Sequence, residues 1–248
     1  MEGAGQRLPD GAAFPLSEVK LLSPILRTRK NVICLGLNYA DHVAEGSRAM
    51  NLERDLPKDP IYFSKPPTVL VGHEEAVIFD EAVSTRMDWE AELGVVMARG
   101  GRKIPKNRAL EYVFGYTCFN DVSARDLQRA RGGQWHMGKS LDTYGPMGPW
   151  IVTADEIPDP QVLNIACRVN GVTKQESNTR NMIFDVATCI ADWSSAVTLE
   201  PGDVFATGTP EGVGFARTPP EFMKPGDTVE VEIERIGVLR NPIVAARS

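Results

Sequence analysis

Two glutamates two positions apart, Glu90 and Glu92, stand where a charged segment gives way to the apolar run Leu93-Gly94-Val95-Val96. In a strand, residues two apart project from the same face at about 7 Å, so both carboxylates would point together near one end of a sheet. Such charges repel unless a cation lies between them, and hard divalent cations prefer oxygen ligands. A solvated strand face is the alternative interpretation of this pair.

A third acid, Asp121, follows the aromatic and apolar segment Tyr112–Asn120, which is typical of a buried strand. An acid that ends such a strand and precedes a helix occupies a place where ligand sites are commonly built. It could equally cap the helix that follows, and spacing alone leaves both interpretations open.

His42 and Glu45 are three residues apart in a segment that resembles the start of a helix, so they share a face. The carboxylate could hold the imidazole and let it activate water, although such pairs are commonly simple surface contacts. The pair directly precedes a polar stretch, Gly46 to Asp59, which is long enough to be either disordered or a functional lid.

Three further side chains are candidates for contact with a substrate. Lys139 lies in a Gly-flanked, loop-like segment and could hold negative charge. Arg125 and Gln128, three apart on the helix expected after Asp121, could reach the far polar end of a substrate. The loop around Thr209 is rich in glycine but lacks the context of a phosphate-binding or dinucleotide-binding motif.

The elements that must position these residues are mostly strands. Alternation of apolar and polar residues, or short apolar runs between turn signals, predicts strands at Asn31–Leu35, Glu92–Ala98, Tyr112–Asn120, Pro149–Thr153, Asn164–Val169 and Val229–Glu234. Few helices are expected: a short one opened by Asn38 and stopped at Gly46, one capped by Ser123 over Ala124–Arg131, and one over Ile183–Ala196. With 22 glycines and 18 prolines, the chain is a turn-dense, β-rich α+β protein.

Composition excludes several classes of function. The 248 residues have a net charge of −6, which argues against nucleic acid and anionic membrane surfaces as partners. We expect a cytoplasmic protein, because no signal peptide or apolar span is present and the four scattered cysteines suit buried, reduced thiols. Scarce histidines disfavour zinc and a two-histidine iron site, and the absence of Gly-x-Ser-x-Gly removes the serine-hydrolase interpretation.

Six motifs occur in the order and at the spacing of one known family: Gly36-Leu-Asn-Tyr-Ala-Asp-His42-Val-Ala-Glu45, Phe63-Ser-Lys65-Pro-Pro, Trp89-Glu90-Ala-Glu92-Leu-Gly, Phe119-Asn-Asp121-Val-Ser-Ala-Arg125-Asp-Leu-Gln128, Gly138-Lys139-Ser and Thr207-Gly-Thr209-Pro-Glu-Gly-Val-Gly. From about Val32 to Val244 the chain therefore resembles the fumarylacetoacetate hydrolase superfamily. The resemblance implies a mixed β-roll or β-sandwich of the type of that family's C-terminal domain, with a few flanking helices, usually as a homodimer.

The resemblance also implies a site. Glu90, Glu92 and Asp121 would hold one Mg²⁺ or Mn²⁺ per subunit, with no organic cofactor, and Thr209 would lie near the substrate carboxylate. In relatives with a matching His-x-x-Glu, that pair is implicated in water activation when the lid closes. Lys139 would assist at the negative charge on the substrate.

We therefore expect residues 1–13 to form a flexible arm and residues 14–248 a single catalytic domain. The predicted activity is hydrolysis of a C–C bond in a 2-oxo or 2,4-dioxo acid, such as an acylpyruvate or a fumarylacetoacetate-like compound, through an enolate that the metal stabilises. Decarboxylation of an oxaloacetate-like acid, or isomerisation of a 2-hydroxy-diene-dioate, could use the same site. A non-catalytic metal or metabolite binder is the alternative from another class.

Overall fold

The computed structural model describes residues 13–52, 55–130 and 133–247. The predicted arm therefore lies, apart from Ala13, outside the described residues. The division of the chain into an arm and the domain 14–248 stays a prediction.

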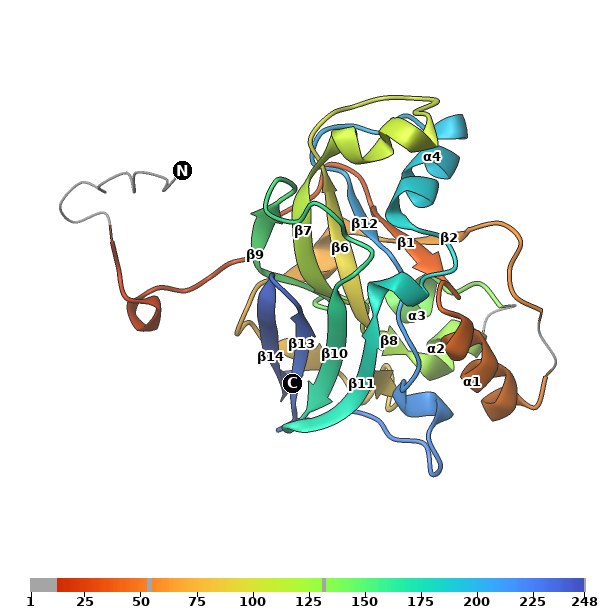
Figure 1. Cartoon of the computed structure of the whole chain (residues 1–248). Helices are drawn as coiled ribbons and strands as arrows, with labels where there is room; N and C mark the ends of the chain where they lie inside the picture. The colour runs from red at the N-terminus through yellow and green to blue at the C-terminus, as the bar shows by residue number, and fades with distance from the viewer. Residues whose placement is uncertain (1–12, 53–54, 131–132, 248) are drawn as a thin grey trace.

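A seven-stranded mixed sheet forms one layer of the molecule, in the order β2-β1-β12-β6-β7-β9-β3 (Figure 1). Its central strand β6 is buried along its whole length, as expected for an apolar run covered on both faces. Two of its pairings are parallel, β1 with β12 and β3 with β9. Its strands are β1 Val32–Gly36, β2 Ile61–Lys65, β3 Leu70–Val71, β6 Ala91–Met97, β7 Val113–Asn120, β9 Gly145–Thr153 and β12 Val204–Ala206.

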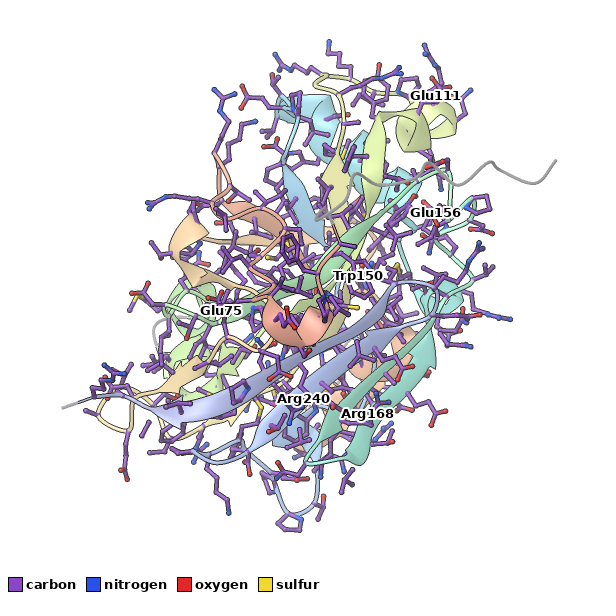
Figure 2. All side chains as sticks on the ribbon, turned by 90° about the vertical axis from the view of Figure 1, so that its left-hand side faces the viewer. Glu75, Glu111, Trp150, Glu156, Arg168 and Arg240 are labelled. Atoms are coloured by element: carbon purple, nitrogen blue, oxygen red, sulfur yellow. The ribbon has the colours of Figure 1, made fainter. Side chains whose placement is uncertain are left out.

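The second layer is a five-stranded sheet in the order β11-β10-β13-β14-β4. Apolar and charged residues alternate along β13, so one face of this sheet is buried and the other faces solvent. The buried residues are Val229, Val231 and Ile233. On the outer face, Arg168 pairs with Glu230 at 3.0 Å and with Glu232 at 2.6 Å. Figure 2 shows Arg168 and Arg240 lying over this sheet. Its strands are β4 Val77–Phe79, β10 Asn164–Val169, β11 Val172–Asn178, β13 Thr228–Ile233 and β14 Gly237–Ala245.

The two sheets pack against each other through β6, β7 and β9 on one side and β10, β13 and β14 on the other. A large apolar core fills the space between them, with Leu93, Val95, Ile165, Val231 and Leu239 among its members. A small two-stranded sheet joins β5 (Met87–Asp88) to β8 (Ser123–Ala124). The expected β-rich sandwich with flanking helices is confirmed.

Helices flank the large sheet at two places (Figure 1). Helix α4 (Val186–Ala196) packs with the 3-10 helix η3 (Lys106–Tyr112), and Asp185 caps it by accepting the backbone N–H of Thr188 at 2.7 Å. The short helices α1 (Ala40–Met50), α2 (Arg125–Ala130) and α3 (His136–Lys139) gather at another end, near β2 and β8. The other 3-10 helices are η1 Leu16–Glu18, η2 Pro67–Val69, η4 Thr179–Asn181 and η5 Gly214–Ala216.

The predicted first helix was wrong at both ends. Helix α1 continues through Gly46 to Met50 and ends at Asn51, whose left-handed φ of 50° makes the C-cap. Asn38 does not cap it, because its amide binds the Phe184 and Thr207 carbonyls and so joins distant loops. Part of the supposed lid is therefore regular helix.

Two other local predictions need correction. Ser123 does not cap a helix, because Ser123–Ala124 pairs with Met87–Asp88 as a strand and α2 begins only at Arg125. Lys139 lies at the end of the short helix α3 and not in a loop. In both cases tertiary pairing and packing override the local sequence signal.

Within the described residues, no helix combines the length and the apolar character that crossing a membrane requires.

Candidate metal centre and active site

The three predicted acids converge at the paired ends of β6 and β7. Antiparallel pairing sets Ala91 opposite Asn120, so Glu90 and Asp121 extend the same ladder, and the backbone N–H of Asp121 donates to the Glu90 carbonyl at 2.9 Å. One carboxylate oxygen from each of Glu90, Glu92 and Asp121 lies within 4.8 Å of the others, and all three residues are buried. The sheet register thus builds the predicted cluster.

Two buried lysines neutralise part of this charge. Lys139 Nζ donates to Glu90 Oε2 at 2.7 Å and to Asp121 Oδ2 at 2.8 Å. Lys65 Nζ, from the end of β2, contacts Asp121 Oδ1 at 2.5 Å and the Val122 carbonyl at 3.1 Å. Burial lowers the pKa of Lys65. For Lys139 burial also lowers the pKa, but Asp121 and Glu90 outweigh it and raise the pKa overall.

Arg125 closes the other side of the cluster. Its Nε donates to Asp88 Oδ2, and its Nη1 forms an ion pair with Glu90 Oε1, each at 2.7 Å. Burial alone would raise the pKa of Glu90. The charges of Lys139, Arg125 and His42 outweigh burial and lower the pKa to about 2. Arg125 Nη2 is buried and has no hydrogen-bond partner among the described residues. Arg125 is also one of the residues that line the cavity described below.

Glu92 shows that the donor set fits a cation. Its Oε2 accepts the backbone N–H of Gly208 at 2.8 Å, whereas Oε1 is buried without a hydrogen-bond partner in the described part of the chain. Burial and the charges of Asp121 and Glu90 raise the pKa of Glu92 well above its ordinary value. A divalent ion bound by these oxygens would satisfy the orphaned atom and offset the repulsion, and an all-oxygen set suits Mg²⁺ or Mn²⁺.

His42 and Glu45 form the expected pair on α1. Nδ1 of His42 lies 2.9 Å from Glu45 Oε1, and each residue is only 8% exposed. The second oxygen, Glu45 Oε2, accepts the backbone N–H of Gly212 at 2.8 Å. If Nδ1 carries the proton donated to Glu45, Nε2 remains as a base. The structure thus brings the two side chains together, and their role in proton transfer stays a proposal.

A cavity of about 210 Å³ joins these groups. It is lined by His42, by Glu90 and Glu92, and by the predicted contacts Arg125, Gln128, Lys139 and Thr209. This volume is below the range of roughly 300–1,000 Å³ that is common for sites of drug-sized ligands, so it suits a small acid. Gln128 Oε1 accepts from Arg125 Nη1 at 3.1 Å, and the Thr209 hydroxyl accepts from Gln175 Nε2 at 2.8 Å.

Sequence reasoning missed two buried residues that support the site. Lys65 stands in the motif Phe63-Ser-Lys65-Pro-Pro, which was the only signal for it. Asp88 opens the acidic run, is fully buried, and accepts hydrogen bonds from Arg125 and from the backbone N–H groups of Trp89, Gly214 and Phe215. Asp88 thus fixes α2 against the glycine-rich loop.

His136 is not among the cavity-lining residues in the described part of the chain, and its Nδ1 lies 3.0 Å from the Ser64 carbonyl oxygen. The four cysteines are free and buried, as expected.

Residues 31–244 match the family described as fumarylacetoacetate (FAA) hydrolase C-terminal. The chain is 45% identical over 230 residues to "Oxaloacetate tautomerase YisK" of Bacillus subtilis, covering 93% of this chain and 75% of that protein.

Two solved structures share the fold. One, from Mycobacterium smegmatis, is described as 5-carboxymethyl-2-hydroxymuconate delta-isomerase, with a TM-score of 0.81 and 39% identity over 96% of this chain and 87% of that one. The other, a fumarylacetoacetate hydrolase from Exiguobacterium antarcticum, has a TM-score of 0.84 and 41% identity over 96% of this chain and 82% of that one.

Proposed function

The chain belongs to the fumarylacetoacetate (FAA) hydrolase family, and from this premise we propose that it is a divalent-metal-dependent enzyme that enolises small 2-oxo acids. Keto–enol tautomerisation of an oxaloacetate-like acid is the reaction proposed first. The observation that carries this proposal is the convergence of Glu90, Glu92 and Asp121 beside a small cavity that Glu90, Glu92 and His42 line.

Enolisation is the step that the reactions of the similar proteins have in common. A tautomerase, an isomerase and a C–C hydrolase acting on 2-oxo acids each need to stabilise negative charge that develops beside the 2-oxo carbonyl. The cavity contains the charges for this task, because Lys139 and Arg125 both line it. The 45% identity to an oxaloacetate tautomerase favours tautomerisation among the three reactions.

Glu90, Glu92 and Asp121 would hold a Mg²⁺ or Mn²⁺ ion. When bound, such an ion supplies Lewis acidity, which polarises a carbonyl oxygen and makes the adjacent C–H more acidic. The orphaned Glu92 Oε1 supports this assignment, because a buried carboxylate oxygen without a partner is costly.

The protein's own groups would move the proton. With Nδ1–H donated to Glu45 Oε1, His42 Nε2 accepts a proton from carbon 3 of the acid, and the carboxylate stabilises the resulting imidazolium. Lys139 stabilises the negative charge that develops on the 2-oxo oxygen. Transfer of this proton from His42 to the 2-oxo oxygen gives the enol, and the reverse transfer, from the enol hydroxyl through His42 to carbon 3, gives the keto form.

Hydrolysis of an acylpyruvate or a fumarylacetoacetate-like acid is the second candidate. The 2.9 Å contact between His42 and Glu45 favours it, because a carboxylate-held imidazole can also take a proton from water. Decarboxylation and isomerisation would use the same cavity without attack by water. A non-catalytic metabolite binder remains the alternative from another class.

Proton exchange distinguishes these possibilities. Protein loaded with Mg²⁺ or Mn²⁺ is mixed with oxaloacetate in D₂O, and hydrogen exchange at carbon 3 is followed by NMR alongside the ultraviolet absorbance of the enol. We expect exchange that EDTA abolishes. Acetylpyruvate is assayed in parallel for cleavage. If neither acid reacts with the metal-loaded protein, the enzymatic proposal fails and the binder is favoured.

The net charge of −6 supports the proposal that the protein binds neither nucleic acid nor anionic membranes. We also propose a cytoplasmic location, which the four free, buried thiols support. We retain a homodimer as the proposed assembly.

A further inference from the structure

Helix α2 presents two arginines to the cavity that differ in exposure. Arg125 is 3% exposed, whereas Arg129 is exposed, and both line the cavity. Lys139, the third Lys or Arg side chain among the described lining residues, is buried against carboxylates. Arg129 therefore brings positive charge to the part of the cavity that meets solvent.

An aromatic ring orients Arg129. The Phe215 ring contacts both guanidinium groups, with its centroid 4.6 Å from Arg125 Cζ and 4.4 Å from Arg129 Cζ. The backbone N–H of Phe215 donates to the buried Asp88 carboxylate at 3.0 Å, and this bond holds the main chain that carries the ring. A guanidinium stacked on a ring still presents its in-plane N–H groups, and these match the two oxygens of a carboxylate.

The spacing along α2 suits a short substrate. Arg129 is one helical turn beyond Arg125, a rise of about 6 Å. Because Arg125 contacts Glu90 of the metal cluster, an acid held by its 2-oxo end at that cluster would extend its other end toward Arg129. An acid of about four to six carbons spans this separation.

We propose that Arg129 is the specificity-determining residue of this site and selects 2-oxo acids that carry a second carboxylate. This inference rests on the proposed function for the orientation of the acid, with its 2-oxo end at the metal cluster. From the sequence we expected Arg125 to reach the far end of the substrate. We now assign that end to Arg129, and Arg125 would contact the substrate nearer the metal.

Binding of unreactive acids tests the assignment without relying on turnover. Malate and 2-hydroxybutanoate have chains of equal length and differ in the second carboxylate. Each is titrated calorimetrically into Mg²⁺-loaded wild type, Arg129→Met and Arg129→Lys. Arg86→Met is the matched control, because Arg86 is also an exposed arginine near a ring, 6.0 Å from the Phe222 centroid, but it does not line the cavity.

We expect wild type to bind malate about 10-fold more tightly than 2-hydroxybutanoate, as one charge-assisted hydrogen-bonded pair would provide. Arg129→Met should remove this preference with 2-hydroxybutanoate affinity unchanged within about twofold, Arg129→Lys should restore part of it, and Arg86→Met should retain it. A preference for malate that persists in Arg129→Met overturns the assignment, as does equal loss of both ligands. Failure of wild type to enolise oxaloacetate would instead refute the proposed function, so the two failures are distinguishable.

Discussion

Glu45 and Gly212 lie 167 positions apart in the chain and are joined by a 2.8 Å hydrogen bond from the Gly212 N–H to Glu45 Oε2. The other oxygen of the same carboxylate holds His42. The loop that contains Gly212 also binds Glu92, through the N–H of Gly208. Helix α1 and the acidic cluster of Glu90, Glu92 and Asp121 are thus connected through one glycine-rich loop.

His42 and Glu45 should behave as one unit. We expect His42→Ala to lower kcat for oxaloacetate enolisation by about 100-fold or more, because a positioned base is removed. Glu45→Gln should lower kcat as well, and the double variant should lose no more than His42→Ala alone. Steady-state kinetics and a Mn²⁺ titration measure this, with exposed Glu211→Gln as the control. Additive losses would show that the two residues act separately.

Replacing Glu92 should weaken metal binding without lowering the stability of the metal-free protein. In Glu92→Gln, Mn²⁺ affinity should fall on the order of 100-fold, since loss of even an outer partner of a metal ligand costs about 10–100-fold. The metal-free variant should melt no lower than metal-free wild type, because a buried, repelled carboxylate becomes a neutral amide. Calorimetric titration and thermal melts in EDTA measure both effects, with exposed Glu176→Gln as the control. Wild-type Mn²⁺ affinity in Glu92→Gln would remove Glu92 from the metal site.

Gly212 should tolerate no side chain. Its φ of +100° is left-handed, and a Cβ there would lie 2.1 Å from the Lys174 carbonyl oxygen, so Gly212→Ala should cost about 3 kcal/mol of unfolding free energy. Gly171→Ala is the matched control, because its φ is +76° with nothing within 4 Å of the added Cβ, and it should cost about 1 kcal/mol. Urea unfolding compares the two, and equal losses would contradict the close approach seen at Gly212.

The thiols should be inert in the native protein. Burial raises the pKa of Cys118 to about 12, and it also raises the pKa of Cys34, Cys167 and Cys189. At pH 8 the reactive thiolate form is therefore scarce and shielded. Ellman's reagent should react with fewer than one thiol per chain before denaturation and with all four in guanidinium chloride. Rapid labelling of the native chain would contradict this burial.

The convergence of the three acids Glu90, Glu92 and Asp121 could be predicted because its determinants are local. Period-two spacing aligned Glu90 with Glu92, and Asp121 ended the adjacent buried strand, so hairpin pairing was enough to join them. Lys65 could not be found in this way, because a lone lysine is usually solvated and only the folded chain shows its ammonium at Asp121.

Helix boundaries failed where distant contacts decide them. Gly46 looked like a stop, but α1 continues past it and the actual C-cap is Asn51, a residue type that also tolerates the left-handed conformation. Ser123 looked like a cap, but it pairs with a strand 35 positions earlier in the chain, at Asp88. Neither partner is visible in a local window of sequence.

The backbone N–H of Asp121 donates to the carbonyl of Glu90, so the proposed cation ligands are anchored in the backbone ladder of the main sheet. The walls opposite them come from short helices, whose side chains can be exchanged without altering that ladder. Protein engineering can therefore treat the anchor and the walls as separate modules. Changes at lining positions of α1 and α2 other than His42, Glu45 and Arg125 would redirect which acids enter, while the groups proposed for proton transfer and cation binding stay in place.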